Sequence, residues 1–167
     1  MKKFVCLKHG GKYDGKYVNI LYSMVKKHST VPFEFVCITE RPHGLDPAIK
    51  VYPCPDWGVA GERKGWWYKV LLFQKQFQEA MGDEFIFFDL DVVIFHNIDK
   101  LWDHKPNEFV VIQDFNRCRI KGWKVRNSSV MKFHPGCENQ VWEEFNKNKM
   151  AVINRMHGDQ DWVTKML

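Results

Sequence analysis

Short apolar runs alternate along the chain with longer segments in which apolar residues recur at helical spacing. A continuous apolar run of about four to eight residues is typical of a strand buried in a sheet. The run Phe85–Phe88 is the clearest case, because no polar residue interrupts it. The pattern predicts strands at Phe4–Leu7, Phe33–Thr39, Ala48–Tyr52, Glu84–Phe88, Phe109–Ile112 and Val130–Phe133.

Amphipathic segments between these runs predict helices. The strongest spans Gly65–Met81, in which large apolar residues from Trp66 to Phe77 recur at intervals of four, three and four. Strands that alternate with helices predict an α/β fold with a mostly parallel central sheet flanked by helices. Further helices are expected after the capping residue Asp14 and at Asn97–Trp102, Glu138–Asn146 and Asp159–Leu167.

Length and composition fit one globular domain. The chain has 167 residues, of which 45% are hydrophobic, and it contains no internal repeat, low-complexity segment or linker. We therefore expect residues 1–167 to form a single domain. The net charge of +5 suits an anionic ligand such as a nucleotide diphosphate, but it equally suits a nucleic acid or an anionic surface.

The cysteines and the apolar runs indicate in which cellular compartment the protein is expected. The five cysteines are scattered and include no CxxC pair, which argues against a disulfide scaffold or a structural zinc site and favours a reducing, intracellular compartment. The opening run Phe4–Leu7 is too short for the apolar region of a signal peptide. No segment reaches the roughly 18 apolar residues of a membrane span. We expect a cytoplasmic protein without a transmembrane segment.

Two carboxylates follow the clearest strand directly, at Asp89 and Asp91. Side chains two residues apart in an extended strand point the same way, so both can reach one site. The carboxyl end of a strand is where open α/β sheets bind ligands. Hard oxygen ligands of this kind suit Mg²⁺ or Mn²⁺ bridging a diphosphate. The alternative is a turn with two solvated aspartates, which is costly in an apolar frame without a cation.

Two weaker features add to this picture. The segment His157–Trp162 places an imidazole, an amide and two carboxylates within six residues, although Asp159 could simply cap a helix. Lys69 lies on the strongest predicted helix, where its stem can pack inside while its ammonium reaches a site. A solvated surface lysine is the alternative at that position.

A basic run without acidic residues occupies the region from Arg117 to Arg126, which also contains Arg119, Lys121 and Lys124. It could contact an anionic acceptor, a membrane or a nucleic acid. A solvated basic loop is the interpretation we favour, so the sequence indicates no clear nucleic-acid partner.

Several segments in order resemble the GT-A glycosyltransferases, above all glycosyltransferase family 8 and related small bacterial and phage-type enzymes. Asp89–Leu90–Asp91 resembles the family's DxD motif, Asn127–Met131 its Asn-Ser/Ala-Gly-Val-Met stretch and Gly158–Asp161 its Asp-Gln-Asp segment. The other matching segments are Tyr17–Tyr22, Pro32–Thr39 and Gly65–Lys69. A lone DxD is weak evidence, whereas the ordered set covers nearly the whole chain.

The resemblance implies a nucleotide-sugar site with Mn²⁺ or Mg²⁺ as cofactor. It assigns the metal to Asp89 and Asp91, with a late histidine completing the site in the family. The histidine near the end of this chain is His157, which becomes the candidate third ligand. Water is the alternative third ligand, and in that case His157 is a loop residue without a ligand role. The residues implied to bind the nucleotide-sugar are Leu7, Lys8, Tyr13, Lys69, Asp89, Leu90, Asp91, Asn127, Ser128 and Ser129.

The resemblance also implies catalytic roles for Lys69 and for the segment Asp159, Gln160 and Asp161. Lys69 would help to balance charge on the leaving diphosphate, and Asp159 or Asp161 would orient sugar hydroxyls or stabilise an oxocarbenium-like centre. Two features depart from the family. Ser129 replaces a glycine, and family members continue well beyond the Asp-Gln-Asp segment, so the acceptor side is expected to be short.

The leading hypothesis is therefore a hexosyltransferase that moves a sugar from a nucleotide-sugar, for example a UDP-sugar, to a glycan, lipid or protein acceptor. A haloacid dehalogenase-type phosphatase is one alternative, because its motif is also a strand plus DxD and Val93 fits it. That superfamily normally opens the chain with this motif, whereas 88 residues precede Asp89. A non-catalytic or truncated nucleotide-sugar-binding domain is the other alternative.

Overall fold

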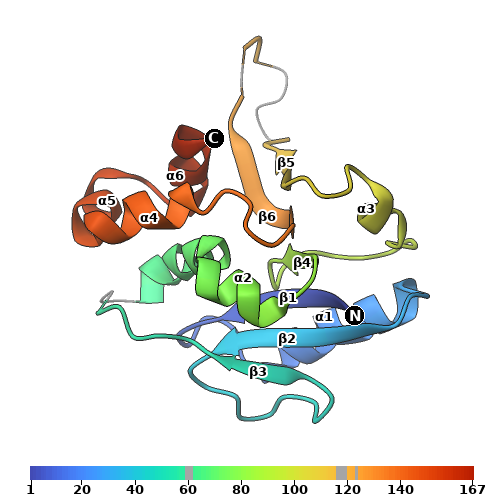
Figure 1. Cartoon of the computed structure of the whole chain (residues 1–167). Helices are drawn as coiled ribbons and strands as arrows, with labels where there is room; N and C mark the ends of the chain where they lie inside the picture. Colours follow the sequence, from blue (N-terminus) through green and yellow to red (C-terminus); the bar gives the residue numbers. More distant parts are fainter. Residues whose placement is uncertain (59–61, 116–119, 123) are drawn as a thin grey trace.

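The computed structural model describes the chain apart from residues 59–61, 116–119 and 123 (Figure 1). Its strands form one sheet in the order β3-β2-β1-β4-β6-β5. The apolar runs predicted these strands but not their order in the sheet, and β6 begins four residues earlier than expected. The strands are β1 Lys2–Lys8, β2 Phe33–Thr39, β3 Lys50–Pro53, β4 Phe85–Phe88, β5 Val110–Gln113 and β6 Arg126–Phe133.

The sheet is parallel in its first half and antiparallel in its second. β1 pairs in parallel with β2 and β4, and β2 pairs in parallel with β3. β6 runs antiparallel to both β4 and β5. The prediction of an α/β fold with a mostly parallel sheet is confirmed. In the parallel half the chain runs outwards from β1 through β2 to β3 and then returns to the opposite side of β1 as β4, so its direction of winding reverses between β1 and β4.

Helices cover both faces of the sheet (Figure 1). Alternate β1 side chains separate two cores, with Phe4 and Cys6 on one face and Val5 on the other. The first core packs against α1 Gly15–His28 and α3 Lys100–Asp103. The second packs against the 3-10 helix η1 Glu62–Phe73, α2 Lys75–Met81, α4 Gln140–Lys147, α5 Lys149–Arg155 and α6 Asp159–Met166.

The prediction of one α-helix over Gly65–Met81 is wrong. Residues up to Phe73 form the 3-10 helix η1, and α2 starts only at Lys75. A 3-10 helix has three residues per turn, so the helical spacing of the apolar residues no longer defines its buried side. Trp66, expected in the core, is 42% exposed, whereas every residue from Trp67 to Phe73 is buried. Packing of η1 against α2, α4 and α6, and of Phe73 against Phe133 of β6, overrides the amphipathic pattern.

Asp99 fastens the end of α1 to the segment before α3. Its carboxylate accepts hydrogen bonds from the Ser29 hydroxyl at 2.9 Å, the Thr30 hydroxyl at 2.6 Å and the Asn97 amide at 2.9 Å. The Thr30 backbone N–H adds a further bond at 3.1 Å. The bonds from Thr30 and then Asn97 hold the pKa of Asp99 well below its usual range.

We expect Asp99→Ala to lower the free energy of unfolding by about 1–2 kcal/mol, because several donors lose one charged acceptor. A carboxylate whose pKa is lowered in the folded state stabilises the fold at pH values above its pKa in the unfolded chain. This contribution is lost as the pH falls through its pKa in the folded state. Urea denaturation at pH 7 and pH 3 measures both effects. The difference in unfolding free energy between wild type and Asp99→Ala should be smaller at pH 3 than at pH 7. The exposed control Asp103→Ala should change the unfolding free energy little at either pH.

None of the helices in the described part of the chain combines the length and apolar character needed to cross a membrane. Cys6, Cys37, Cys54 and Cys137 are free thiols. Two residues of the predicted basic run, Arg117 and Arg119, lie outside the described residues.

Candidate functional site

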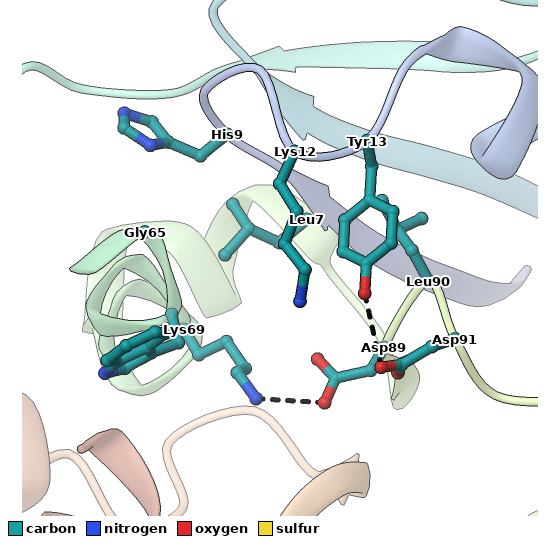
Figure 2. Close-up of a pocket in the computed structure, with 10 residues that line it drawn as sticks. Leu7, His9, Lys12, Tyr13, Gly65, Lys69, Asp89, Leu90 and Asp91 are labelled. Carbon is teal, nitrogen blue, oxygen red and sulfur yellow. Dashed lines mark hydrogen bonds and ion pairs between the residues drawn. The ribbon is translucent and has the colours of Figure 1, made fainter. Parts of the chain in front are cut away.

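A pocket opens where the carboxyl ends of β1 and β4 lie side by side (Figure 2). The winding of the sheet reverses between these strands, and such switch points leave a crevice at the carboxyl edge of an open sheet. The pocket has a volume of about 480 Å³. Its lining residues come from the end of β1 and the following loop, from η1 and from the turn after β4, namely Leu7, His9, Lys12, Tyr13, Gly65, Trp66, Lys69, Asp89, Leu90 and Asp91.

The ammonium of Lys69 joins three parts of the chain. It donates to the Asp89 carboxylate at 3.0 Å and to the Ser128 hydroxyl on β6 at 3.1 Å. It also lies 3.5 Å from the carboxylate of Asp159, the first residue of α6. Ser128 in turn donates to Asp159 at 2.6 Å. The Asp159 carboxylate is therefore engaged in this network. The N-cap position of α6 is occupied by the preceding residue, Gly158, and not by Asp159.

Burial sets the electrostatics of this network. It disfavours the charge on Lys69, but Asp159 and Asp89 outweigh it and raise the pKa of the Lys69 ammonium. Burial also raises the pKa of the Asp89 carboxyl, and Lys69 opposes this only in part. The Lys69 ammonium is thus shared between two carboxylates, so the negative charge of Asp89 is only partly neutralised. Additional positive charge near Asp89 would be favourable.

Asp91 differs from Asp89 in being exposed at the mouth of the pocket. Its carboxylate accepts a hydrogen bond from the Tyr13 hydroxyl at 3.3 Å. The position of the turn is fixed by the backbone, because the N–H of Asp89 donates to the Ser129 carbonyl at 2.9 Å and extends the β4–β6 pairing by one residue. Figure 2 shows the carboxylates of Asp89 and Asp91 lying near each other on one wall, with the Lys12 side chain extending towards them.

The 3-10 geometry of η1 shapes the opposite wall. Residues three apart lie above one another in such a helix. Trp66 and Lys69 therefore project from the same side, and both line the pocket. In an α-helix they would be rotated by about 300° rather than a full turn. Residues three apart are also neighbours on an α-helix, so the 3-10 conformation aligns the exposed Trp66 indole with the Lys69 side chain more closely than the predicted helix would.

The structure brings together part of the predicted site. Leu7, Tyr13, Lys69, Leu90 and both DxD aspartates line the pocket, and the Lys69 network adds Ser128 and Asp159. Ser129 contributes its backbone carbonyl to the DxD turn, while Asn127 accepts a hydrogen bond from the Ser129 N–H at 2.9 Å.

Other predicted residues lie elsewhere. Lys8 is buried and donates to the Arg41 carbonyl at 2.9 Å, because strand alternation turns it away from Leu7. The His157 side chain is 99% exposed, and its Nδ1 lies 3.4 Å from Asp161 one turn along α6. Among the described residues, His157 does not come together with Asp89 and Asp91 in a three-residue metal cluster. Gln160 neighbours Asp159 on α6 and is not among the pocket-lining residues.

Four lining residues were missing from the predicted site, namely His9, Lys12, Gly65 and Trp66. His9 and Lys12 belong to the loop after β1, whose place near a ligand was expected although these two side chains were not singled out. Trp66 was assigned to the core. The alternation of β1 could have excluded Lys8, whereas nothing in the sequence marks the 3-10 conformation that exposes Trp66.

No protein-family model and no curated protein sequence matches this chain. Solved structures do match. The galactosyltransferase LgtC, crystallised with donor and acceptor sugar analogues, superimposes with a TM-score of 0.67 at 14% identity, over 96% of this chain and 69% of LgtC. An active-site mutant of LgtC gives the same TM-score at 13% identity, over 96% of this chain and 68% of the mutant.

The bifunctional glycosyltransferase WbbM matches with a TM-score of 0.62 at 12% identity. The match covers 98% of this chain but only 36% of WbbM. Identities this low establish the fold and nothing finer. The chain has the GT-A glycosyltransferase fold, with a central sheet flanked by helices as in LgtC.

Proposed function

We propose that the pocket between β1 and β4 binds a nucleotide-sugar with a divalent cation, and that the protein transfers the hexosyl group to an acceptor. The observation that carries this proposal is the buried Lys69 held between Asp89 and Asp159 beside the exposed Asp91. The fold supports it, since LgtC, which shares this fold, binds donor and acceptor sugar analogues.

The charges on the pocket fit a divalent cation. Asp89, Asp91 and Asp159 contribute three carboxylates, against the two ammonium groups of Lys69 and Lys12. Carboxylate oxygens are the ligands that Mg²⁺ and Mn²⁺ prefer, and the burial of Asp89 makes added positive charge favourable. Asp89 and Asp91 would hold the cation. When bound, it neutralises negative charge on a diphosphate.

The protein's own groups divide the remaining tasks. Leu7 and Tyr13 offer an apolar and aromatic surface for a base or ribose, and the exposed Lys12 can reach a phosphate. Lys69 is fixed by its partners, so it presents positive charge to a leaving diphosphate without reorganising. Ser128 of β6 and Asp159 of α6 contact the same Lys69 ammonium, and we place the donor sugar and its hydroxyl groups beside this network.

Release of nucleoside diphosphate tests this function. The protein is incubated with a panel of UDP-hexoses and Mn²⁺, and UDP is quantified with and without a chelator. We expect cation-dependent UDP release from at least one donor, which Asp89→Asn lowers by about 100-fold or more and the exposed control Asp103→Asn leaves intact. Chelator-resistant release would contradict the cation's role. Binding without release would favour a binding domain, and turnover of an aryl phosphate would favour the phosphatase.

A further inference from the structure

Three potential metal ligands follow directly after three neighbouring parallel strands. His9 comes after β1, Glu40 after β2 and Cys54 after β3. The strands are in register at their ends, because Lys8 pairs with Thr39 and Thr39 with Pro53. The next residue of each strand therefore falls in one row at the carboxyl edge of the sheet. The Cys54 N–H continues this ladder by donating to the Thr39 carbonyl at 3.2 Å.

The side chains of this row converge. One ligand atom from each of His9, Glu40 and Cys54 lies within 4.8 Å of the other two. Ligand atoms of a tetrahedral zinc site lie roughly 3.3–3.7 Å apart, given bonds of about 2.0–2.3 Å. Glu40 is exposed, so rotation of its side chain can close the difference. Figure 2 shows His9 on the side of the pocket away from Asp89 and Asp91, so the row is distinct from the DxD turn.

The His9 ring is held in place but incompletely satisfied. It stacks on Tyr68 with ring centroids 4.1 Å apart, and an added Cβ at Gly65 would come within 3.3 Å of its Nδ1. Nδ1 is buried and has no hydrogen-bond partner among the described residues. Buried polar atoms without partners are rare in folded proteins and call for an explanation.

Glu40 is oriented by the neighbouring loop. The N–H of Gly10 donates to one oxygen of its carboxylate at 2.8 Å. Gly10 has a φ of 72°, a conformation that favours glycine. In this conformation the turn after β1 directs the Gly10 N–H towards Glu40. The ion pair of Glu40 with Arg41 at 3.5 Å is exposed and contributes little. The carboxylate keeps its second oxygen for another partner.

We propose that His9, Glu40 and Cys54 form a Zn²⁺ site that clips together the carboxyl ends of β1, β2 and β3. A thiolate, an imidazole and a carboxylate form a borderline-soft ligand set, which suits Zn²⁺ and differs from the all-oxygen set at Asp89 and Asp91. Three protein ligands leave the fourth tetrahedral position to water. The site goes beyond the proposed sugar transfer and does not depend on it.

Binding exchanges a proton for the metal. Burial, with a further contribution from Glu40, raises the pKa of Cys54 to about 12, so the free thiol is protonated at neutral pH. When the Zn–S bond forms, the S–H bond breaks and the proton leaves to solvent. Because His9 also lines the pocket, the metal would fix one wall of the proposed nucleotide site.

Cobalt substitution tests the proposal on the metal-free full chain. Co²⁺ occupies zinc sites, and a Co²⁺–thiolate bond gives a charge-transfer absorption in the near ultraviolet that carboxylate-bound Co²⁺ does not give. We expect one such chromophore per chain, displaced by one equivalent of Zn²⁺. Cys54→Ser should abolish it, and His9→Gln and Glu40→Gln should each weaken Co²⁺ binding by roughly tenfold or more.

Two matched controls separate this site from others. Cys137→Ser removes a half-buried cysteine outside the row and should leave the chromophore unchanged. Asp91→Asn should also leave it unchanged, so failure of the DxD assignment and failure of this site are distinguishable. Absence of the chromophore in the wild type, or its persistence in Cys54→Ser, would overturn the proposal. If Cys54→Ser does not fold, unchanged Co²⁺ affinity in both His9→Gln and Glu40→Gln would overturn it.

Discussion

Replacement of Asp91 by asparagine is expected to weaken Mn²⁺-dependent binding of UDP by about 100-fold or more while leaving the fold as stable as the wild type. Asp91 is exposed, and among the described residues its carboxylate accepts one hydrogen bond, from Tyr13 at 3.3 Å, so folding depends little on its charge. Loss of a residue that only orients a metal ligand costs 10- to 100-fold in metal affinity, and we propose that Asp91 is itself a ligand.

Isothermal titration of UDP in the presence and absence of Mn²⁺ measures this effect. Asp103→Asn is the matched control, because Asp103 is an exposed aspartate on α3, and α3 packs on the face of the sheet opposite to η1. Urea denaturation should give equal unfolding free energies for wild type and both variants. An unchanged Mn²⁺-dependent affinity in Asp91→Asn would remove Asp91 from the metal site.

Lys69→Met is expected to destabilise the protein by about 3–5 kcal/mol, because it leaves two carboxylates near each other without their shared cation. The Lys69 ammonium is 3.0 Å from Asp89 and 3.5 Å from Asp159, and the Lys69 side chain is only 10% exposed. Methionine preserves most of the volume and apolar stem of lysine, so lost packing contributes little.

The control for this variant is Lys75→Met. Lys75 pairs with Glu79 at 3.9 Å on the surface of α2, where both side chains are largely exposed, and such a pair contributes about 0–1 kcal/mol. Equilibrium unfolding in urea compares the two variants. A loss below about 1 kcal/mol in Lys69→Met would show that the Lys69 network does not hold the site together. Partial recovery in Lys69→Met/Asp159→Asn would show that the cost arises from the unpaired carboxylates.

Local patterns predicted much of the fold and the centre of the site. The apolar run before Asp89 is typical of a buried strand, and a buried strand delivers the two aspartates to the carboxyl edge of the sheet. Ser128 and Asp159 were included through the resemblance to glycosyltransferases. Their contact through Lys69 depends on how β6 and α6 pack, and no local pattern encodes that packing.

Two features escaped prediction for physical reasons. The helical spacing between Trp66 and Phe77 is a valid amphipathic signal, but η1 is a 3-10 helix whose residues from Trp67 to Phe73 are all buried, so that spacing does not mark its buried side and Trp66 is exposed. The clustering of a histidine, a glutamate and a cysteine also escaped prediction, because motif spacing detects only local ligand pairs. His9, Glu40 and Cys54 come from three different strand ends, so only the strand register brings them together.

A crystal structure with UDP and Mn²⁺ bound tests the central claim most directly, because the anomalous signal of manganese identifies the ion. The account predicts an anomalous peak within bonding distance of carboxylate oxygens of Asp89 and Asp91. The diphosphate should contact the same ion, and the nucleoside should lie against Leu7 and Tyr13. A nucleotide bound outside the pocket between β1 and β4, or a manganese ion bound away from Asp89 and Asp91, would contradict the account.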